Sequence, residues 1–132
     1  MPHHMSAEMQ SCIEECLECH RICLETAAHC LQMGGEHASP EHITGLLDCA
    51  EICQTSANFM LRGSADHGET CAACAIVCER CAASCESMGK EDDLMRRCAQ
   101  ACRRCAESCR QLAGSRTRAF LAGQLEAQRS PV

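Results

Sequence analysis

The most regular pattern along the chain is a row of cysteines that recurs every three or four residues. Between Cys71 and Cys85, five cysteines follow one another at intervals of three, four, three and four residues. At about 100° per residue, these intervals place all five side chains on one face of an α-helix. No proline or glycine interrupts the segment. The pattern therefore predicts a helix whose buried face consists of sulfur.

Three other segments show the same pattern. The motif C-x3-C-x2-C-x3-C occurs three times in the chain, and a fourth segment follows it with serine and methionine at two of its positions. These motifs predict helices over residues 6–33, 40–62, 66–88 and 91–114. The cysteines on them are Cys12, Cys16, Cys19, Cys23 and Cys30 in the first helix, Cys49 and Cys53 in the second, Cys71, Cys74, Cys78, Cys81 and Cys85 in the third, and Cys98, Cys102, Cys105 and Cys109 in the fourth.

Turn and capping residues separate the four predicted helices. Gly34 ends the first helix, and Ser39 followed by Pro40 begins the second, as is typical of helix ends and starts. Because the connections are short, the helices should pack as an antiparallel up-down-up-down four-helix bundle. We therefore expect an all-α fold, with a cysteine-rich bundle over residues 1–114. The tail over residues 115–132 is predicted to be partly helical, with one short helix.

Cysteines of successive predicted helices fall at matching heights if the helices pair in antiparallel fashion. One turn is centred near residue 36 and the other lies over residues 89–92. The matched pairs are Cys12 with Met60, Cys16 with Ser56, Cys19 with Cys53 and Cys23 with Cys49 around the first turn, and Cys74 with Cys109, Cys78 with Cys105, Cys81 with Cys102 and Cys85 with Cys98 around the second. The sulfur atoms should therefore stack in layers along one axis.

Conventional core residues are scarce in this chain. Isoleucine, leucine, valine and phenylalanine together number 19 of 132 residues. A neutral cysteine packs as a small hydrophobic side chain, so the core and the functional site are expected to consist of the same atoms. The first helix also carries a second apolar row, which either closes the seam with a neighbouring helix or forms a subunit interface. This row comprises Ile13, Leu17, Leu24 and Leu31.

Composition and charge narrow the function further. Sixteen residues are cysteine, and the formal net charge is −6. An acidic chain argues against nucleic acid as the main partner, and no apolar stretch is long enough to predict a membrane span. The N-terminal residues contain no apolar signal segment, so we expect a cytoplasmic protein whose thiols stay reduced. In that setting, repeated cysteines indicate metal sites rather than disulfides.

Methionine and histidine provide further soft ligands at both ends of the predicted thiol column. Met60 and His67 fall at one end, whereas His42 falls at the other, together with Met33, Met88 and Met95. We predict that all sixteen cysteines, with Met60 and His67, bind metal. For His42 both readings stay open at this point: a metal ligand, or a histidine exposed to solvent near the start of a helix.

The charge of buried thiolates decides which metal suits this column. Buried thiolates need a compensating cation, and a zinc ion bound by four thiolates still leaves a net charge of −2. Cu(I) is monovalent and soft, so roughly one ion per thiolate cancels the charge. We therefore predict that the protein binds and stores many Cu(I) ions, with a zinc or general heavy-metal thiolate buffer as the alternative. An enzyme is not expected, because a redox enzyme needs an exposed, activated cysteine.

The repeated motifs, the cysteine-lined four-helix plan and the terminal Met and His residues resemble the cytosolic bacterial copper storage proteins. The likeness extends over residues 6–114. It implies a homotetramer of bundles that holds many Cu(I) ions through cysteine thiolates, with histidine and methionine near the mouth and with copper donor or acceptor proteins as partners. The chain departs from the pattern at Thr26, Ser56 and Met60, where the repeat would allow cysteine.

Overall fold

The computed structural model describes residues 5–88, 91–114, 122, 123 and 127. Its long helices are α1 (Ala7–Met33), α2 (Pro40–Leu61), α3 (His67–Met88) and α4 (Asp93–Leu112), and the short 3-10 helix η1 (Gly35–Ala38) joins α1 to α2. The predicted bounds of all four helices are confirmed to within two residues. The helix expected in the tail falls largely on residues outside those described.

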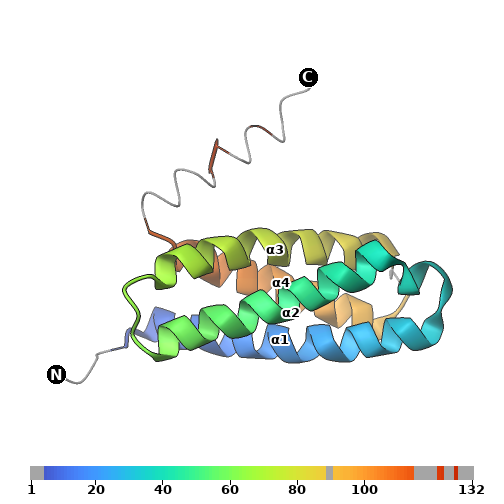
Figure 1. Ribbon diagram of the computed structural model, residues 1–132, viewed down its shortest axis with the longest axis horizontal. Coiled ribbons are helices and arrows are strands. Elements are labelled where there is room, and N and C mark those ends of the chain that lie inside the picture. Colours follow the sequence, from blue (N-terminus) through green and yellow to red (C-terminus); the bar gives the residue numbers. More distant parts are fainter. Residues whose placement is uncertain (1–4, 89–90, 115–121, 124–126, 128–132) are drawn as a thin grey trace.

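The four helices run alternately up and down along one long axis (Figure 1). Helices α1 and α3 each pack against both α2 and α4, so the four rods enclose a common centre. The bundle therefore has two distinct ends. We call the end with η1, where α3 ends and α4 begins, the loop end, and the end with the 62–66 connection the α2–α3 end. This arrangement confirms the predicted up-down-up-down bundle.

Capping residues fix where the helices begin. The Ser6 side chain accepts a hydrogen bond from the Met9 backbone N–H at 3.1 Å, and the Asp92 side chain accepts one from the Met95 backbone N–H. Such caps satisfy backbone groups that a helix end leaves unpaired. At the end of α1, Gly34 has φ +72°, a conformation that glycine adopts at little cost. The cysteine rows are thereby held at fixed heights.

The core consists mainly of cysteine and alanine. All sixteen cysteines are buried, with at most 3% of any one exposed, and none is in a disulfide. Among the described isoleucine, leucine, valine and phenylalanine residues, only Ile13, Ile22 and Leu46 are buried. The thiols therefore point inward, as predicted.

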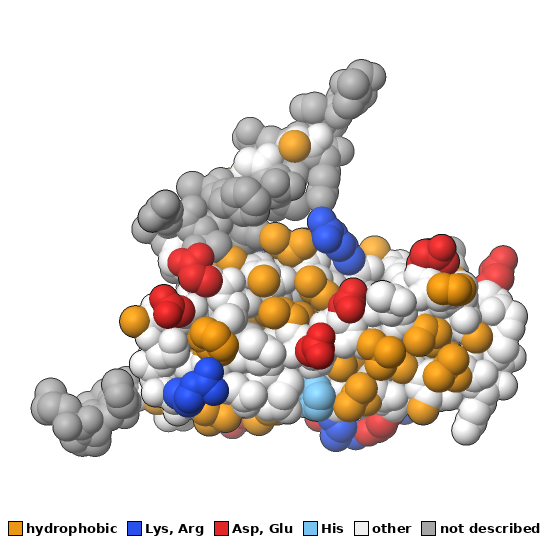
Figure 2. Space-filling view, viewed as in Figure 1, with side chains coloured by type: hydrophobic (Ala, Val, Ile, Leu, Met, Phe, Trp, Pro, Cys, Tyr) orange, Lys and Arg blue, Asp and Glu red, His pale blue; other side chains and the backbone are white. Residues whose placement is uncertain are grey.

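The second apolar row on α1 divides between core and surface. Ile13 is buried, whereas the three leucines that follow it are between 38% and 58% exposed. Figure 2 shows apolar side chains gathered over one face of the bundle. The row therefore closes a helix seam at Ile13 and remains uncovered in the single chain at Leu17, Leu24 and Leu31.

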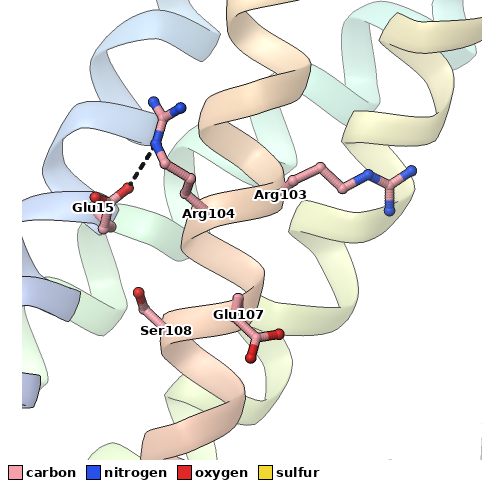
Figure 3. A pocket seen from close by; sticks show the side chains of 5 residues that line it. All are labelled: Glu15, Arg103, Arg104, Glu107 and Ser108. Carbon is pink, nitrogen blue, oxygen red and sulfur yellow. Dashed lines mark hydrogen bonds and ion pairs between the residues drawn. The ribbon is translucent and has the colours of Figure 1, made fainter.

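Charged side chains lie on the outside of the bundle. Figure 3 shows the side chains that line a shallow pocket beside α4. In this pocket Arg104 pairs with Glu15, with 3.3 Å between Nε and Oε2, while Arg103 extends in another direction. Arg103 binds Glu86 on α3 at 2.6 Å. These partners lie on the surface and are between 28% and 55% exposed, and such pairs contribute only about 0–1 kcal/mol each. None of the described helices is both long enough and apolar enough to cross a membrane.

Candidate metal centre

Sulfur atoms from all four helices meet along the bundle axis. Cys19 Sγ lies 3.8 Å from Cys49 Sγ and 3.7 Å from Cys102 Sγ, and Cys53 Sγ lies 3.5 Å from Cys78 Sγ. A disulfide would require about 2.0 Å, so these contacts are non-bonded. With a metal–sulfur bond of about 2.3 Å, two thiolates on one metal lie about 3.8–4.0 Å apart. The thiols already have nearly this spacing.

The column divides into overlapping groups in which every pair of sulfur atoms lies within 4.8 Å. Four groups contain four cysteines, and one contains three. They are Cys16, Cys74, Cys105 and Cys109; Cys19, Cys53, Cys78 and Cys105; Cys19, Cys23, Cys49 and Cys102; Cys23, Cys81, Cys98 and Cys102; and Cys12, Cys71 and Cys109. Each group shares at least one sulfur with another, so adjacent metal ions would be joined through common thiolates.

The predicted layers agree with these groups. Cys19 and Cys53 occur in one group and Cys23 and Cys49 in the next, as the register of α1 and α2 requires. The partners predicted for Cys78 and Cys74 on α4 are likewise in their groups. Contacts between α1 and α4, such as Cys12 Sγ to Cys109 Sγ at 3.6 Å, were outside the prediction, because sequence pairs only successive helices.

The thiols in the column influence one another's protonation. Hydrogen bonds from Cys105 and Cys109 lower the pKa of Cys16 to about 6, because S–H donors stabilise a thiolate. Hydrogen bonding with Cys105 and other thiols, together with burial, raises the pKa of Cys53. One thiolate is thus stabilised only while its neighbours keep their protons. Deprotonating the whole column requires cations among the sulfurs.

At the α2–α3 end, three thiols meet one thioether and one hydroxyl. Cys71 Sγ lies 3.9 Å from Met60 Sδ and 3.5 Å from Ser56 Oγ. Hydrogen bonds from Cys109 and Cys12 lower the pKa of Cys71, and the nearby charge of His67 acts in the same direction. The serine and methionine that replace cysteine on α2 therefore still face the column.

His67 lies in the first turn of α3, close to this end of the column. Its side chain is half-buried, and its Nδ1 donates a hydrogen bond to the Ser64 carbonyl oxygen at 2.9 Å. Within the described residues, His67 makes no hydrogen bond to a sulfur atom, although its charge reaches Cys71. Within the part of the chain that the structure describes, its Nε2 makes no hydrogen bond, so this nitrogen could take a ligand near the column.

At the loop end, Cys30 and His42 face each other. His42 Nε2 lies 3.5 Å from Cys30 Sγ, and its Nδ1 lies 2.8 Å from Ser84 Oγ. Burial lowers the pKa of His42, and His37 adds to this effect; burial also raises the pKa of Cys30 to about 11, with the charge of Asp92 adding to it. His42 was not among the predicted ligands. The antiparallel register that places Cys23 at the same height as Cys49 also places Cys30 at the same height as His42. This relation could have identified His42 from the sequence.

Cys85 completes the set of predicted thiols. It is 1% exposed and belongs to none of the overlapping groups. The pKa of Cys85 is raised, mainly by hydrogen bonding with Cys81 and Cys98. It therefore adjoins the loop-end side of the column, at the level that the register predicts for Cys98. The structure thus brings fifteen of the cysteines into one column, and it places Cys30 beside His42.

Comparison with known proteins agrees with this geometry. The family model for the copper storage protein, Csp, matches residues 5–114. The structure of Nmul_A1745 from Nitrosospira multiformis is 48% identical, with a TM-score of 0.75, and covers 80% of this chain and 94% of that one. The Cu(I)-bound copper storage protein BsCsp3 of Bacillus subtilis is 34% identical, with a TM-score of 0.75, and covers 81% and 99%.

Two further relatives extend the comparison. A cytosolic copper storage protein from Streptomyces lividans, in a structure with five coppers, is 31% identical, with a TM-score of 0.70, and covers 80% of this chain and 91% of that one. The uncharacterized cysteine-rich protein YhjQ of Bacillus subtilis is 36% identical over 75 residues, which are 54% of this chain and 66% of that protein. The chain belongs to the copper storage protein family.

Proposed function

We propose that the chain stores many Cu(I) ions along the axis of its bundle. The observation that carries this proposal is the column of free thiols spaced 3.5–3.9 Å apart, together with the Cu(I)-bound state of BsCsp3. Soft thiolates select Cu(I), and one ion per thiolate leaves the buried cluster nearly neutral. The proposed ligands are all sixteen cysteines, with Met60 and His67 at the α2–α3 end. We assign storage to the bundle over residues 1–114 and propose that residues 115–132 are a tail outside it.

Zinc fits the same column less well. Among the described residues, only two of the four-cysteine groups can be filled at once without sharing a sulfur. Zinc in a closed site takes four ligands and leaves a charge of −2 per site. Copper(I) accepts two or three bridging thiolates, so shared sulfurs such as those of Cys19 and Cys105 favour a chain of copper ions. A zinc or general heavy-metal buffer remains the second candidate.

The proposal extends to a storage role without catalysis in the cytoplasm. A catalytic thiol must be reachable, whereas every cysteine here is buried. A cytoplasmic location is supported by the cytosolic relative from Streptomyces lividans and by the free thiols. The protein would exchange copper with donor or acceptor proteins, without binding nucleic acid or a membrane.

The exposed leucines of α1 favour an assembly of several chains. Leu17, Leu24 and Leu31 lie on one side of the helix and are 38%, 44% and 58% exposed. An uncovered apolar row is typical of an interaction surface, and we propose a homotetramer. Sedimentation of the wild-type chain and of Leu24→Glu tests this. A wild-type mass of four chains is expected, with dissociation in the variant, and a wild-type monomer would contradict the proposal.

Anaerobic titration of the reduced protein tests the main proposal. Cu(I) is added in steps, and the metal held against a competing Cu(I) chelator is counted per chain. We expect saturation at about one ion per cysteine, with the same chain outcompeting the chelator for copper but holding zinc less tightly. Saturation at one or two copper ions per chain would contradict storage, and a preference for zinc would favour the second candidate.

A further inference from the structure

Thr26 interrupts the row of cysteines on α1 with a hydroxyl group. It lies three residues after Cys23 and four before Cys30, on the same face of the helix. The whole residue is 0% exposed. Among the residues that the structure describes, its Oγ1 is the one buried side-chain nitrogen or oxygen atom without a hydrogen-bond partner. A polar group is therefore enclosed beside the thiol column without being satisfied there.

A threonine inside a helix usually has a partner on its own helix. Its hydroxyl can donate to the carbonyl oxygen three or four residues earlier, which here belongs to Cys23 or Ile22. Within the described part of the chain, the Thr26 hydroxyl makes neither bond. A buried hydroxyl without a partner destabilises the fold, and valine would fill the same space without that cost. The unpaired hydroxyl therefore indicates an acceptor that forms only when the column changes its charge.

Cys23 carries the sulfur atom that the Thr26 hydroxyl can reach. Side chains on a helix lean toward its N-terminus, so Thr26 lies over the turn that carries Cys23 and away from Cys30. Residues three apart on one face have Cβ atoms about 5–6 Å apart. Rotation about the Cα–Cβ bonds can therefore bring Thr26 Oγ1 to the Cys23 sulfur without moving the backbone.

The Cys23 sulfur is shared between two of the four-cysteine groups. One group joins it to Cys19, Cys49 and Cys102, and the other joins it to Cys81, Cys98 and Cys102. Its Sγ lies 3.7 Å from Cys98 Sγ and 3.8 Å from Cys102 Sγ. A thiolate that bridges two copper ions uses two of its three lone pairs. The third lone pair of Cys23 is then left to accept a hydrogen bond.

Copper loading changes what the neighbouring sulfur can accept. A neutral thiol is a weak acceptor, whereas a metal-bound cysteine is a thiolate, and hydrogen bonds to charged acceptors are about twice as strong as neutral ones. Across the helix pair, the register places Leu46 at the height of Thr26, and this buried side chain has no polar atom. The thiolate of Cys23 is therefore the acceptor that loading would create for Thr26.

We propose that Thr26 Oγ1 donates a hydrogen bond to the Cys23 thiolate in the copper-loaded protein and so strengthens the hold on the ions that this sulfur bridges. The inference rests on the proposed storage of Cu(I). Thr26 is a positioning residue and not a ligand, because a hydroxyl oxygen is too hard for Cu(I). The hydrogen bond orients the sulfur and supports its negative charge, as the partners of metal ligands commonly do.

Thr26→Val tests the proposal because it removes the hydroxyl and keeps the shape. Two properties are measured on the full, reduced chain: chemical denaturation without metal, and retention of Cu(I) against a chelator after loading. Without metal, Thr26→Val should be more stable than wild type, because the unpaired hydroxyl is gone. After loading, it should bind the same number of ions but hold those on Cys23 about tenfold less tightly. Thr26→Ser should restore retention, and Thr44→Val, at an exposed position on α2, is the matched control.

Opposite effects on the two properties distinguish this role from a purely structural one. If Thr26→Val retained copper as well as wild type, or if Thr26→Ser were as weak as Thr26→Val, the hydrogen bond to Cys23 would be overturned and storage left intact. Lower stability of Thr26→Val without metal would mean that the hydroxyl is already paired, which also overturns the proposal. Failure of the wild-type chain to hold many copper ions would overturn storage, and this inference with it.

Discussion

The two ends of the bundle place the same residue types in different surroundings. At the loop end, the imidazole of His42 is buried, with one ring nitrogen at Ser84 and the other facing Cys30. At the α2–α3 end, His67 is half-buried and bonds a backbone carbonyl, whereas Cys71 faces a thioether at 3.9 Å. One end thus pairs sulfur with nitrogen, and the other pairs sulfur with sulfur.

The difference follows from where each histidine stands in its helix. His42 is the third residue of α2, on the same face as Leu46 and Cys49, and its side chain is carried inward. His67 is the first residue of α3, four residues before Cys71, where the helix has just begun. A histidine near a helix start is therefore buried or partly exposed according to its position within the first turn.

The largest effect is expected from removing the buried thioethers at the two ends. Met60 and Met95 are both 0% exposed. Met60→Ala and Met95→Ala should each lower the free energy of unfolding of the metal-free protein by about 2–5 kcal/mol, because each leaves a cavity. Chemical denaturation under reducing conditions measures this.

Leucine at the same positions separates packing from ligand chemistry. Met60→Leu and Met95→Leu conserve volume and should cost less than about 1.5 kcal/mol. Only Met60→Leu should weaken copper retention, because Met60 Sδ contacts Cys71 Sγ. If both variants retained copper equally well, the Met60 thioether would not contribute to the difference between the two ends.

The two histidines should differ in what their loss changes. His67→Ala should leave the number of bound copper ions unchanged and slow loading about tenfold, equivalent to about 1.4 kcal/mol in the barrier. The reason is that Nε2, which has no hydrogen bond to any described residue, can receive an incoming ion near the column. Stopped-flow mixing with a Cu(I) donor complex measures the rate. His20→Ala serves as the matched control. An unchanged loading rate in His67→Ala would mean that His67 does not assist copper uptake at the α2–α3 end.

A smaller effect is expected from the cap that closes the loop end. Asp92 caps α4 through the Met95 N–H and bonds His29 at 2.6 Å. Asp92→Ala should cost about 1 kcal/mol. The hydrogen bond from His29 holds the pKa of Asp92 below its usual value, with the Met95 N–H adding to this.

The pH dependence of this cap follows from the sign of the shift. A carboxyl with a lowered pKa in the folded state adds stability above its unfolded pKa, and this is lost as the pH falls through the folded value. Unfolding measured from pH 6 to pH 2 should therefore converge for wild type and Asp92→Ala at the acid end. Ser6→Ala at the opposite end has no such titration, and its cost should stay constant with pH.

The smallest effect is expected on the outer wall, away from both ends. Arg104 pairs with Glu15 at 3.3 Å with more than half of the arginine side chain exposed. Arg104→Ala should change the free energy of unfolding by less than about 0.5 kcal/mol, with copper capacity unaffected. A larger decrease in the free energy of unfolding would mean that ion pairs on the outer surface of the bundle also contribute substantially to stability.

Sequence alone was sufficient for most of this architecture because one residue type carries both the periodicity and the chemistry. The three- and four-residue spacings located the four helices, and the antiparallel register placed Cys19 beside Cys53. What the register could not supply is how the two helical hairpins pack together, and hence contacts such as Cys23 Sγ to Cys98 Sγ at 3.7 Å. The register that pairs Cys30 with His42 was available in the sequence, but the contact of His42 Nδ1 with Ser84 Oγ on α3 could not be read from it.

Shared sulfurs have a consequence for how the chain fills. When one ion settles among Cys19, Cys53, Cys78 and Cys105, it deprotonates and fixes two thiolates that also belong to the adjoining groups. The next ion then binds to thiolates that the first ion has already deprotonated and ordered, so its own binding loses less conformational entropy. Clusters should therefore grow outward from a first nucleus, and half-loaded samples should contain nearly full chains beside nearly empty ones.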